Sequence, residues 1–364
     1  MATKKDNTTA AANGAAFESA ARGLNGVRAG QHGAARLQEV AQQWRNTSPE
    51  RLAGRLAEEL HATSFNADAA TKGLNSLKAG TGAANGAGTA AADVTIRNGA
   101  RIIDQAQVKY HGTPASTAFD VAKVRYDGMQ RVVPSDQAAR VREIAAKRGV
   151  DGLGQRNYPD VAQKAADRIR SGGAESTPVS RAEALDAAKN TQRVAGELVG
   201  GRVVGAVKNG ALAGAAVGGG ISVVTNFIAF TDGKKSGEDA VVDAATDTAT
   251  CAATGAAVSG LAVAAEAALV RAGAGALAGG AAPVAIGLTA VEMAKDVGRF
   301  INGDIDGEKF AGRAGGHVVK GSCTWGGMEG GAAIGTLICP GVGTVIGGIL
   351  GGIGGGLFGG WLVD

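Results

Sequence analysis

The sequence predicts a two-part chain, with an α/β domain followed by an all-α region rich in glycine and alanine. Two observations indicate this division. Residues 1–200 carry 27 Lys and Arg against 20 Asp and Glu, whereas residues 201–364 carry 10 against 13. Long stretches without any ionisable side chain occur only in the second part. We therefore place the boundary near Gly200, and a chain of 364 residues has room for two ordinary domains.

Composition excludes two classes of protein and bears on the compartment. The 60 glycines do not recur at every third residue, which excludes collagen. Cys251, Cys323 and Cys339 are too few for a disulfide scaffold and odd in number, which indicates a reducing compartment. Residues 1–16 are polar and lack the apolar core of a signal peptide. We expect the first part to stay in the cytoplasm or to be exported by specialised machinery.

The first 47 residues predict a disordered leader over 1–14 and then a helical segment. A further helix begins at Ser48-Pro49-Glu50, because these residues supply a cap, a proline at the first helical position and an acidic first turn. Its buried stripe consists of three leucines spaced by four residues, Leu52, Leu56 and Leu60. The low-complexity stretch 77–91 predicts a flexible connection.

Residues 48–150 predict the α/β domain itself. β-Branched residues flank Asn98-Gly99, a strong hairpin signal, and place strands at 92–97 and 101–110. A helix at 114–124, a short strand at 129–133 and a helix at 135–148 complete the domain. Residues 151–200 predict a helical linker: one helix runs to Arg170 and ends at Ser171-Gly172-Gly173, and a capping box at Ser180 begins another.

Four polar residues of this domain suggest metal-dependent chemistry. Asp93 opens the first predicted strand, and Gln107 and Lys109 close the second. Glu58 or Glu59 lies on the preceding helix, and we choose Glu59 as the assisting residue. Carboxylate and amide oxygens can hold a divalent cation that activates water and neutralises charge on phosphorus. A lysine beside them can orient or deprotonate that water.

This order of residues resembles the PD-(D/E)xK nucleases, in which a helical Glu precedes a strand Asp and an acidic or amide residue stands two positions before Lys. Gln107-Val108-Lys109 resembles the Gln-x-Lys variant of the Mrr group of restriction-endonuclease-like proteins. The resemblance covers residues 48–150 and implies a small mixed sheet with flanking helices. It also implies a Mg²⁺ site at Asp93, Gln107 and Glu59, and DNA as a partner. We interpret His61 as a packing residue rather than a base.

The second part predicts membrane helices. Three uncharged stretches, 209–231, 272–291 and 330–363, are 23, 20 and 34 residues long, and 248–265 is a fourth of 18. A helix needs about 20 residues to cross a bilayer. Glycines in these stretches recur every fourth residue, at 210, 214 and 218 and again at Gly335, Gly343, Gly347, Gly351, Gly355 and Gly359. Such spacing forms a smooth face on which helices associate in lipid, and it resembles glycine-zipper membrane segments.

A weak internal repeat with an offset of 70 residues accompanies this pattern. Residues 226–238 and 299–308 each contain the end of an apolar helix, a polar turn with glycine, and a Gly-Glu pair. The repeat predicts two helical hairpins, each with a short charged turn.

Two functions of different class follow from these patterns. The first is a bacterial inner-membrane protein with a cytoplasmic nuclease-like domain, active in phage defence or interbacterial antagonism. The alternative is a non-enzymatic glycine-zipper effector that permeabilises membranes or a structural membrane protein, whose soluble half regulates or delivers it. The zipper also predicts self-association. A third interpretation keeps the nuclease-like fold without activity.

Overall fold

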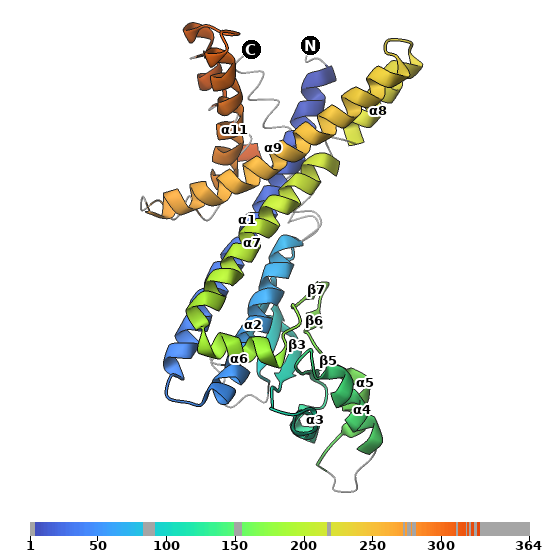
Figure 1. Cartoon of the computed structure of the whole chain (residues 1–364), viewed down its shortest axis with the longest axis vertical. Coiled ribbons are helices and arrows are strands. Elements are labelled where there is room, and N and C mark those ends of the chain that lie inside the picture. Colours follow the sequence, from blue (N-terminus) through green and yellow to red (C-terminus); the bar gives the residue numbers. More distant parts are fainter. Residues whose placement is uncertain are drawn as a thin grey trace. The chain divides into compact units, whose positions relative to one another are not determined.

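The computed structural model describes residues 4–82, 92–148, 155–216, 220–271, 282–310, 312–317 and 322–323, 326–327, with residues 274, 278 and 319. The chain forms two compact units. We call residues 26–201 the sheet unit, and residues 1–25 with 202–364 the helical unit. The secondary structure is mixed α/β up to residue 189, and the elements described after it are helices, which confirms the coarse fold class (Figure 1).

The sheet unit contains a five-stranded mixed sheet in the order β1-β2-β3-β4-β5. β1, β2 and β3 form an antiparallel meander, whereas β3, β4 and β5 are parallel. The strands are β1 (Leu77–Thr81), β2 (Val94–Asn98), β3 (Arg101–Val108), β4 (Gln130–Val132) and β5 (Ala165–Ala166), and a separate hairpin pairs β6 (Arg170–Ser171) with β7 (Ala174–Glu175). The helices are α1 (Lys4–Gln43), α2 (Pro49–Thr71), α3 (Pro114–Val121), α4 (Ala138–Arg148), α5 (Tyr158–Lys164), α6 (Arg181–Lys189) and α7 (Thr191–Gly214), with a 3₁₀ turn at Val124–Tyr126.

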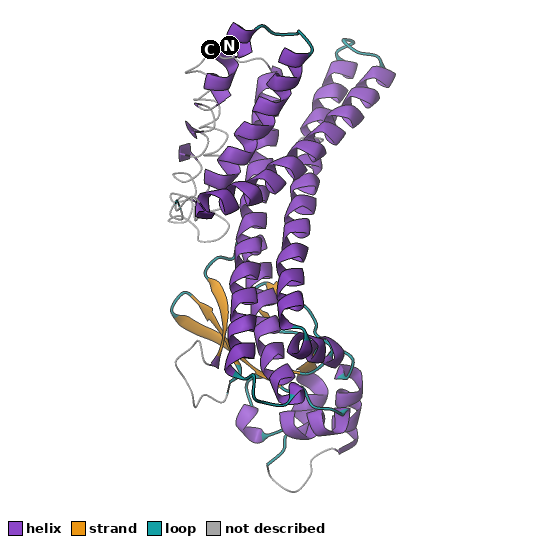
Figure 2. Cartoon of the chain, turned by 60° about the vertical axis from the view of Figure 1, so that its left-hand side comes forward, coloured by secondary structure: helices purple, strands orange, loops and turns teal. Residues whose placement is uncertain are grey.

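Two apolar clusters hold this unit together. The first joins α2 to β1, β2 and β3, and includes Leu56, Ile96 and Val108. The second joins α3, α4 and α5 around Val141 and Tyr158. Figure 2 shows the strands beside the helices of this unit. Side chains alternate along a strand, so Gln107 and Lys109 face away from the first cluster, to which Ala106 and Val108 belong.

The helix start at Pro49 and the hairpin at residues 94–108 are confirmed. Asn98 pairs with Arg101, so the two loop residues are Gly99 and Ala100, and Gly99 takes the positive φ of 58° that the turn requires. The capping box at Ser180 is also confirmed, because its hydroxyl accepts from Glu183 N while the Glu183 carboxylate accepts from Ser180 N.

Four expectations for the first 200 residues are wrong in detail. The helix expected to run to Arg170 ends at Lys164, and residues 165–166 and 170–171 are strands. α1 begins at Lys4, within the predicted leader. Residues 77–81 form β1 instead of a flexible connection, because they pair with β2 on one side while the Asn66 amide bonds both Ala79 N and Ala79 O at 2.7 and 2.9 Å. Residues 83–91 lie outside the described part. The predicted linker belongs to the sheet unit, since β5 extends the sheet and α6 packs against α2.

The helical unit contains α8 (Gly220–Thr231), α9 (Gly237–Arg271) and α11 (Ala282–Ile301), with the end of α7. The predicted span 209–231 is divided between α7 and α8, and the predicted span 272–291 enters α11 only at Ala282. The stretch 248–265 lies inside α9. Within the described residues, Gly237–Val270 is the helix long and apolar enough to cross a membrane, with a mean hydropathy of 1.6. Residues 330–363, with the zipper glycines Gly335 to Gly359, lie outside the described part.

The early glycine spacing does produce a close helix contact. A Cβ added at Gly214 would lie 2.1 Å from Cys251 O, and one added at Gly255 would lie 2.1 Å from Gly210 O. Real Cβ atoms do not approach backbone oxygen so closely, so α7 and α9 pack backbone to backbone at these positions. This is the contact for which a four-residue glycine period is suited.

We expect Gly255→Ala to destabilise the helical unit by about 1–3 kcal/mol, because the clash is with backbone and cannot be relieved by a rotamer change. Gly260→Ala on the same helix is the matched control, since the nearest atom to its added Cβ is Val207 Cγ2 at 3.8 Å. That control is expected to be neutral or slightly stabilising, as alanine favours helix by up to about 1 kcal/mol. Thermal unfolding followed by circular dichroism compares the two; equal midpoints would contradict the contact.

The internal repeat is confirmed in the backbone. Gly233 and Gly303, offset by 70, have positive φ of 69° and 81°. Lys234 N bonds Ala229 O at 2.9 Å, and the equivalent Asp304 N bonds Arg299 O at 2.8 Å. Each following helix is capped by a side chain, Ser236 for the first and Asp306 for the second. Two turns of equal geometry thus follow α8 and α11.

Candidate functional site

The site centres on Asp93, which immediately precedes β2. Asp93 N donates to Ala106 O at 3.0 Å, and Gly82 N donates to Asp93 O at 3.1 Å, so the backbone of Asp93 is bonded on both sides. Val94 pairs with Ala106. Asp93 therefore lies opposite Gln107 on the neighbouring strand, and the hairpin brings the two side chains to the same face.

Three donors from the end of β3 converge on one carboxylate oxygen, Asp93 Oδ2. Lys109 Nζ and Val108 N each donate from 2.9 Å, and Gln107 Nε2 donates as well. The side chains of Asp93 and Lys109 remain 15% and 18% exposed. The structure thus brings Asp93, Gln107 and Lys109 together and leaves the Asp93 and Lys109 side chains partly accessible from solvent.

Gln107 carries an unsatisfied acceptor at this site. The residue is only 1% exposed, and its Oε1 has no hydrogen-bond partner in the described part of the chain. Buried acceptors are almost always paired, so an orphan requires a reason. An amide oxygen beside a carboxylate fits a hard divalent cation such as Mg²⁺, whose ligands are oxygen atoms.

The two glutamates of α2 differ in placement. Glu59, our chosen helical residue, lies beside the start of β2: its Oε1 accepts from Oγ1 of Thr81, the partner of Val94 in the sheet, at 2.6 Å and lies 3.5 Å from Arg36 Nη2. Glu58 also lies in the electrostatic field of Asp93 and Lys109. The sequence offered both residues and contained no signal to choose between them.

Burial raises the pKa of Glu58 to about 8, and the nearby Asp93 carboxylate adds to the shift. The folded chain therefore holds a proton that the unfolded chain releases near pH 4.5. Between about pH 4.5 and pH 8 the folded state binds one more proton than the unfolded state, so the free energy of unfolding falls as the pH rises across this range.

We expect Glu58→Gln, which cannot ionise, to be more stable than the wild type above pH 8 and to lose this pH dependence. Urea unfolding in EDTA from pH 4 to 9 measures it. Glu39→Gln, at a side chain that is 64% exposed, is the control. Parallel pH profiles for wild type and Glu58→Gln would show that Glu58 is not the buried acid.

His61 is a packing residue, as the sequence predicted. It is fully buried, and its Nδ1 and Nε2 lie 2.9 Å from Ser176 Oγ and Tyr110 Oη. Tyr110 Oη donates to Val179 O at 2.7 Å, so it accepts from Nε2. Ser176 Oγ accepts from Ile169 N and therefore donates to Nδ1. Burial lowers the pKa of His61 to about 4 and keeps the ring neutral.

Cations and aromatic rings surround the site. Lys109 Nζ lies 5.6 Å from the Tyr126 ring centroid, and Arg125 lies 4.8 Å from it. Arg156 stacks 4.0 Å over Phe119, whose ring is 51% exposed. A cavity of about 430 Å³ adjoins Phe119 and is lined by His111, Ala115, Ser116, Phe119, Asp120 and Arg148. Sequence reasoning missed this surface, because its residues are dispersed over 109–156.

Other carboxylates do not add ligands to the site. The described residues contain no group of three or more His, Cys, Asp or Glu that could hold a metal ion. The candidate ligands are therefore two carboxylates, Asp93 and Glu58, and the Gln107 amide. Comparisons of the chain with protein-family models, curated protein sequences and solved structures find no significant match.

Proposed function

We propose that the sheet unit is a nuclease-like domain that hydrolyses phosphodiester bonds with a divalent metal ion. The observation that carries this proposal is the convergence of Asp93, Gln107 and Lys109, with the buried Gln107 Oε1 left without a partner. The order of elements supports it. A glutamate on α2, an aspartate before β2 and Gln-x-Lys at the end of β3 occur in the order of the nucleases that the sequence resembles.

Asp93, the Gln107 amide oxygen and Glu58 are the residues that would hold the metal. Bound Mg²⁺ would supply Lewis-acid stabilisation of the phosphate charge and a more acidic water. Asp93 keeps Lys109 within 2.9 Å, so a cationic amine is fixed beside the carboxylate before substrate arrives. Such preorganised charge stabilises a developing anion more than mobile charge in water does.

The surroundings suit a nucleic-acid substrate. Lys109, Arg125, Arg148 and Arg156 lie near or on aromatic rings of the same unit. Such cations can neutralise phosphates, and Phe119, the ring of this set that is exposed (51%), can stack on an unpaired base, whereas Tyr126 and Tyr158 are buried. The test is incubation of the purified full chain with supercoiled plasmid, single-stranded DNA and RNA, with Mg²⁺ or EDTA. Cleavage of any of these substrates in Mg²⁺ but not in EDTA supports the proposal. If none of them is cleaved in Mg²⁺, the proposed catalytic activity is wrong.

A second candidate function is membrane association of the helical unit. The specific observation is α9, whose segment Gly237–Val270 has the length and hydropathy of a membrane span, with 28% of its most apolar window buried inside the unit. Pelleting of the native protein with membranes after carbonate washing tests it, and full release into the supernatant contradicts it. A nuclease-like domain on a membrane-associated chain would suit phage defence or antagonism between bacteria.

A further inference from the structure

The side chains of α8 are inverted relative to a helix of a water-soluble protein. Among the α8 side chains that the structure describes, the buried ones are polar, Ser222 at 2% and Asn226 at 5% exposure. Its large exposed side chains are apolar, with Val223, Val224, Phe227 and Ile228 between 38% and 62% exposed. Buried polar groups and exposed apolar patches are the informative exceptions to normal burial.

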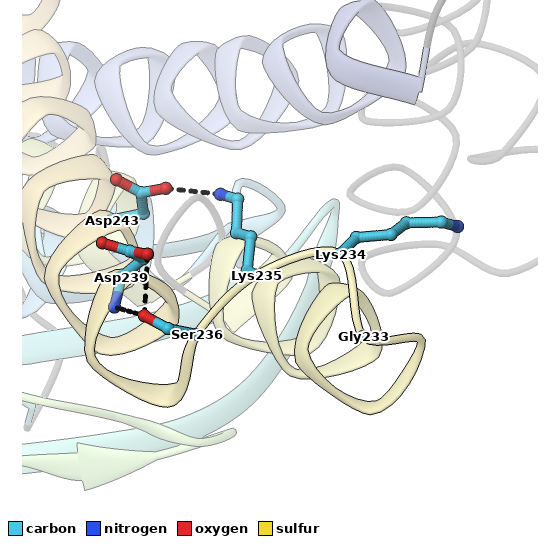
Figure 3. Close-up of a pocket in the computed structure, with 6 residues that line it drawn as sticks. All are labelled: Gly233, Lys234, Lys235, Ser236, Asp239 and Asp243. Atoms are coloured by element: carbon cyan, nitrogen blue, oxygen red, sulfur yellow. Dashed lines mark hydrogen bonds and ion pairs between the residues drawn. The ribbon is translucent and has the colours of Figure 1, made fainter.

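The polar side of α8 is bonded to α9 by a continuous ladder. Ser222 Oγ donates to Asp247 Oδ2 at 2.6 Å, and Asn226 Nδ2 donates to Ser222 Oγ at 3.0 Å. Lys235 Nζ donates to Asn226 Oδ1 at 2.7 Å and pairs with Asp243. Figure 3 shows Lys235 reaching towards Asp243 across the turn, while Lys234 extends in another direction. The polar groups of the two helices are thus satisfied against one another.

The apolar side continues on α9. Val241 and Val242 are 69% and 55% exposed, and no charged side chain occurs from Thr248 to Ala265. Figure 1 shows α8 and α9 joined at their turn. The hairpin is therefore polar at its seam and carries exposed apolar side chains on both helices, while the exposed carboxylates of α9, Glu238, Asp239 and Asp247, lie in its first three turns.

We propose that the acyl chains of a lipid bilayer cover the outer face of the α8–α9 hairpin, defined by Val223, Val224, Phe227, Ile228, Val241 and Val242. This inference rests on the second candidate function, membrane association. Lipid is the occupant that fits this face, because exposed apolar side chains are solvated favourably by acyl chains and unfavourably by water. Hydrogen bonds between helices then hold the hairpin together where no hydrophobic force does.

The ladder and the turn have separate roles on this assignment. The ladder pairs the two polar side chains of α8 that are buried, Ser222 and Asn226, so that neither opposes insertion. The turn carries Asp232, Lys234 and Lys235, which are exposed or half-exposed and belong at the headgroup level. α8, with 12 residues, is about 18 Å long, enough to reach through one leaflet of the roughly 30 Å hydrocarbon core.

The test uses the full chain with Cys251, Cys323 and Cys339 changed to Ala and a single labelling site. An environment-sensitive fluorophore is attached to Phe227→Cys, and to Ile102→Cys on β3 as a control that is 47% exposed in the wild type. Vesicles contain phosphatidylcholine and phosphatidylglycerol at a ratio of about 3 to 1. We expect a shift to shorter wavelength and quenching by brominated acyl chains at position 227, and neither at position 102.

Flotation of unlabelled protein with the same vesicles gives the second measurement. We expect Val224→Asp to lower partitioning about a hundredfold, given the penalty for an aspartate in hydrocarbon, and Ile102→Asp to leave it unchanged. Circular dichroism of both variants confirms folding. If the protein floats with the vesicles but the fluorophore at position 227 shows no spectral shift or quenching, the hairpin does not contact the acyl chains, and the proposal is wrong while membrane association is still supported. A shift at 227 that needs no vesicles and grows with protein concentration would assign the face to a second copy of the chain and overturn the lipid proposal.

Discussion

Asp93→Asn should abolish Mg²⁺-dependent cleavage, with a loss of at least about a hundredfold. The substitution keeps the size of the side chain but removes the charge that fixes Lys109 and completes the metal ligands. Lys109→Ala should lose about 10² to 10⁴ because it removes the positioned amine. Initial rates of nicking, measured at saturating Mg²⁺, give both values.

Two matched controls come from the same sheet. Asp104→Asn changes a carboxylate on β3 that accepts from Gln130 Nε2 at 2.6 Å, and Lys78→Ala changes an exposed lysine on β1. Both variants should cleave at close to the wild-type rate. If Asp93→Asn retains wild-type activity, or if the controls lose as much as Asp93→Asn, the assignment of the site is wrong.

Arg131→Ala should destabilise the sheet unit by about 3–5 kcal/mol. Arg131 lies on β4 and is fully buried, and its Nε and Nη2 each contact a carboxylate at 2.5 Å, those of Asp160 and Asp127. Its Nη1 also donates to Val121 O. Truncation removes the partner of two carboxylates and a backbone carbonyl at once, and it leaves a cavity between α3 and α5.

Urea unfolding with Arg140→Ala as the control measures this loss. The Arg140 side chain is 58% exposed and bonds Glu143 on the same helix, an arrangement worth less than about 1 kcal/mol. Arg131→Lys should recover part of the stability, because one amine cannot reach all the acceptors of a guanidinium. Equal midpoints for Arg131→Ala and Arg140→Ala would show that this buried network contributes little.

Local sequence was sufficient where a short segment contains its own structural signal. Ser48-Pro49-Glu50, the Ser180 capping box and the residues around Asn98-Gly99 predicted two helix starts and a hairpin that the structure confirms. The turn alone would place Asp93 opposite Ala106, and a register shift between Ile96 and Arg97 places it opposite Gln107 instead. The repeated turns at Gly233 and Gly303 were equally readable from their shared composition.

The predictions from sequence were wrong where contacts between residues distant in the sequence determine the structure. Leu77–Thr81 contains alanine and glycine, which favour strands weakly, and it becomes a strand because β2 and Asn66 supply its hydrogen bonds. The stretch 151–200 looked like a solvated linker, yet α6 packs on α2 and β5 completes the sheet. Uncharged stretches of suitable length did not each become one helix, since 209–231 is divided between α7 and α8.

The sequence by itself determined the division into a mixed α/β part and a helical part, and the hairpin, because charge distribution and turn residues are local properties. Only the tertiary structure decided the register shift that places Asp93 opposite Gln107, the burial of Gln107 Oε1 without a partner among the described residues, and the inward orientation of Ser222 and Asn226 on α8. These features depend on how elements that are distant in the sequence pack against one another. The sequence of a single helix or strand does not show which neighbour it will contact or which of its faces will be buried.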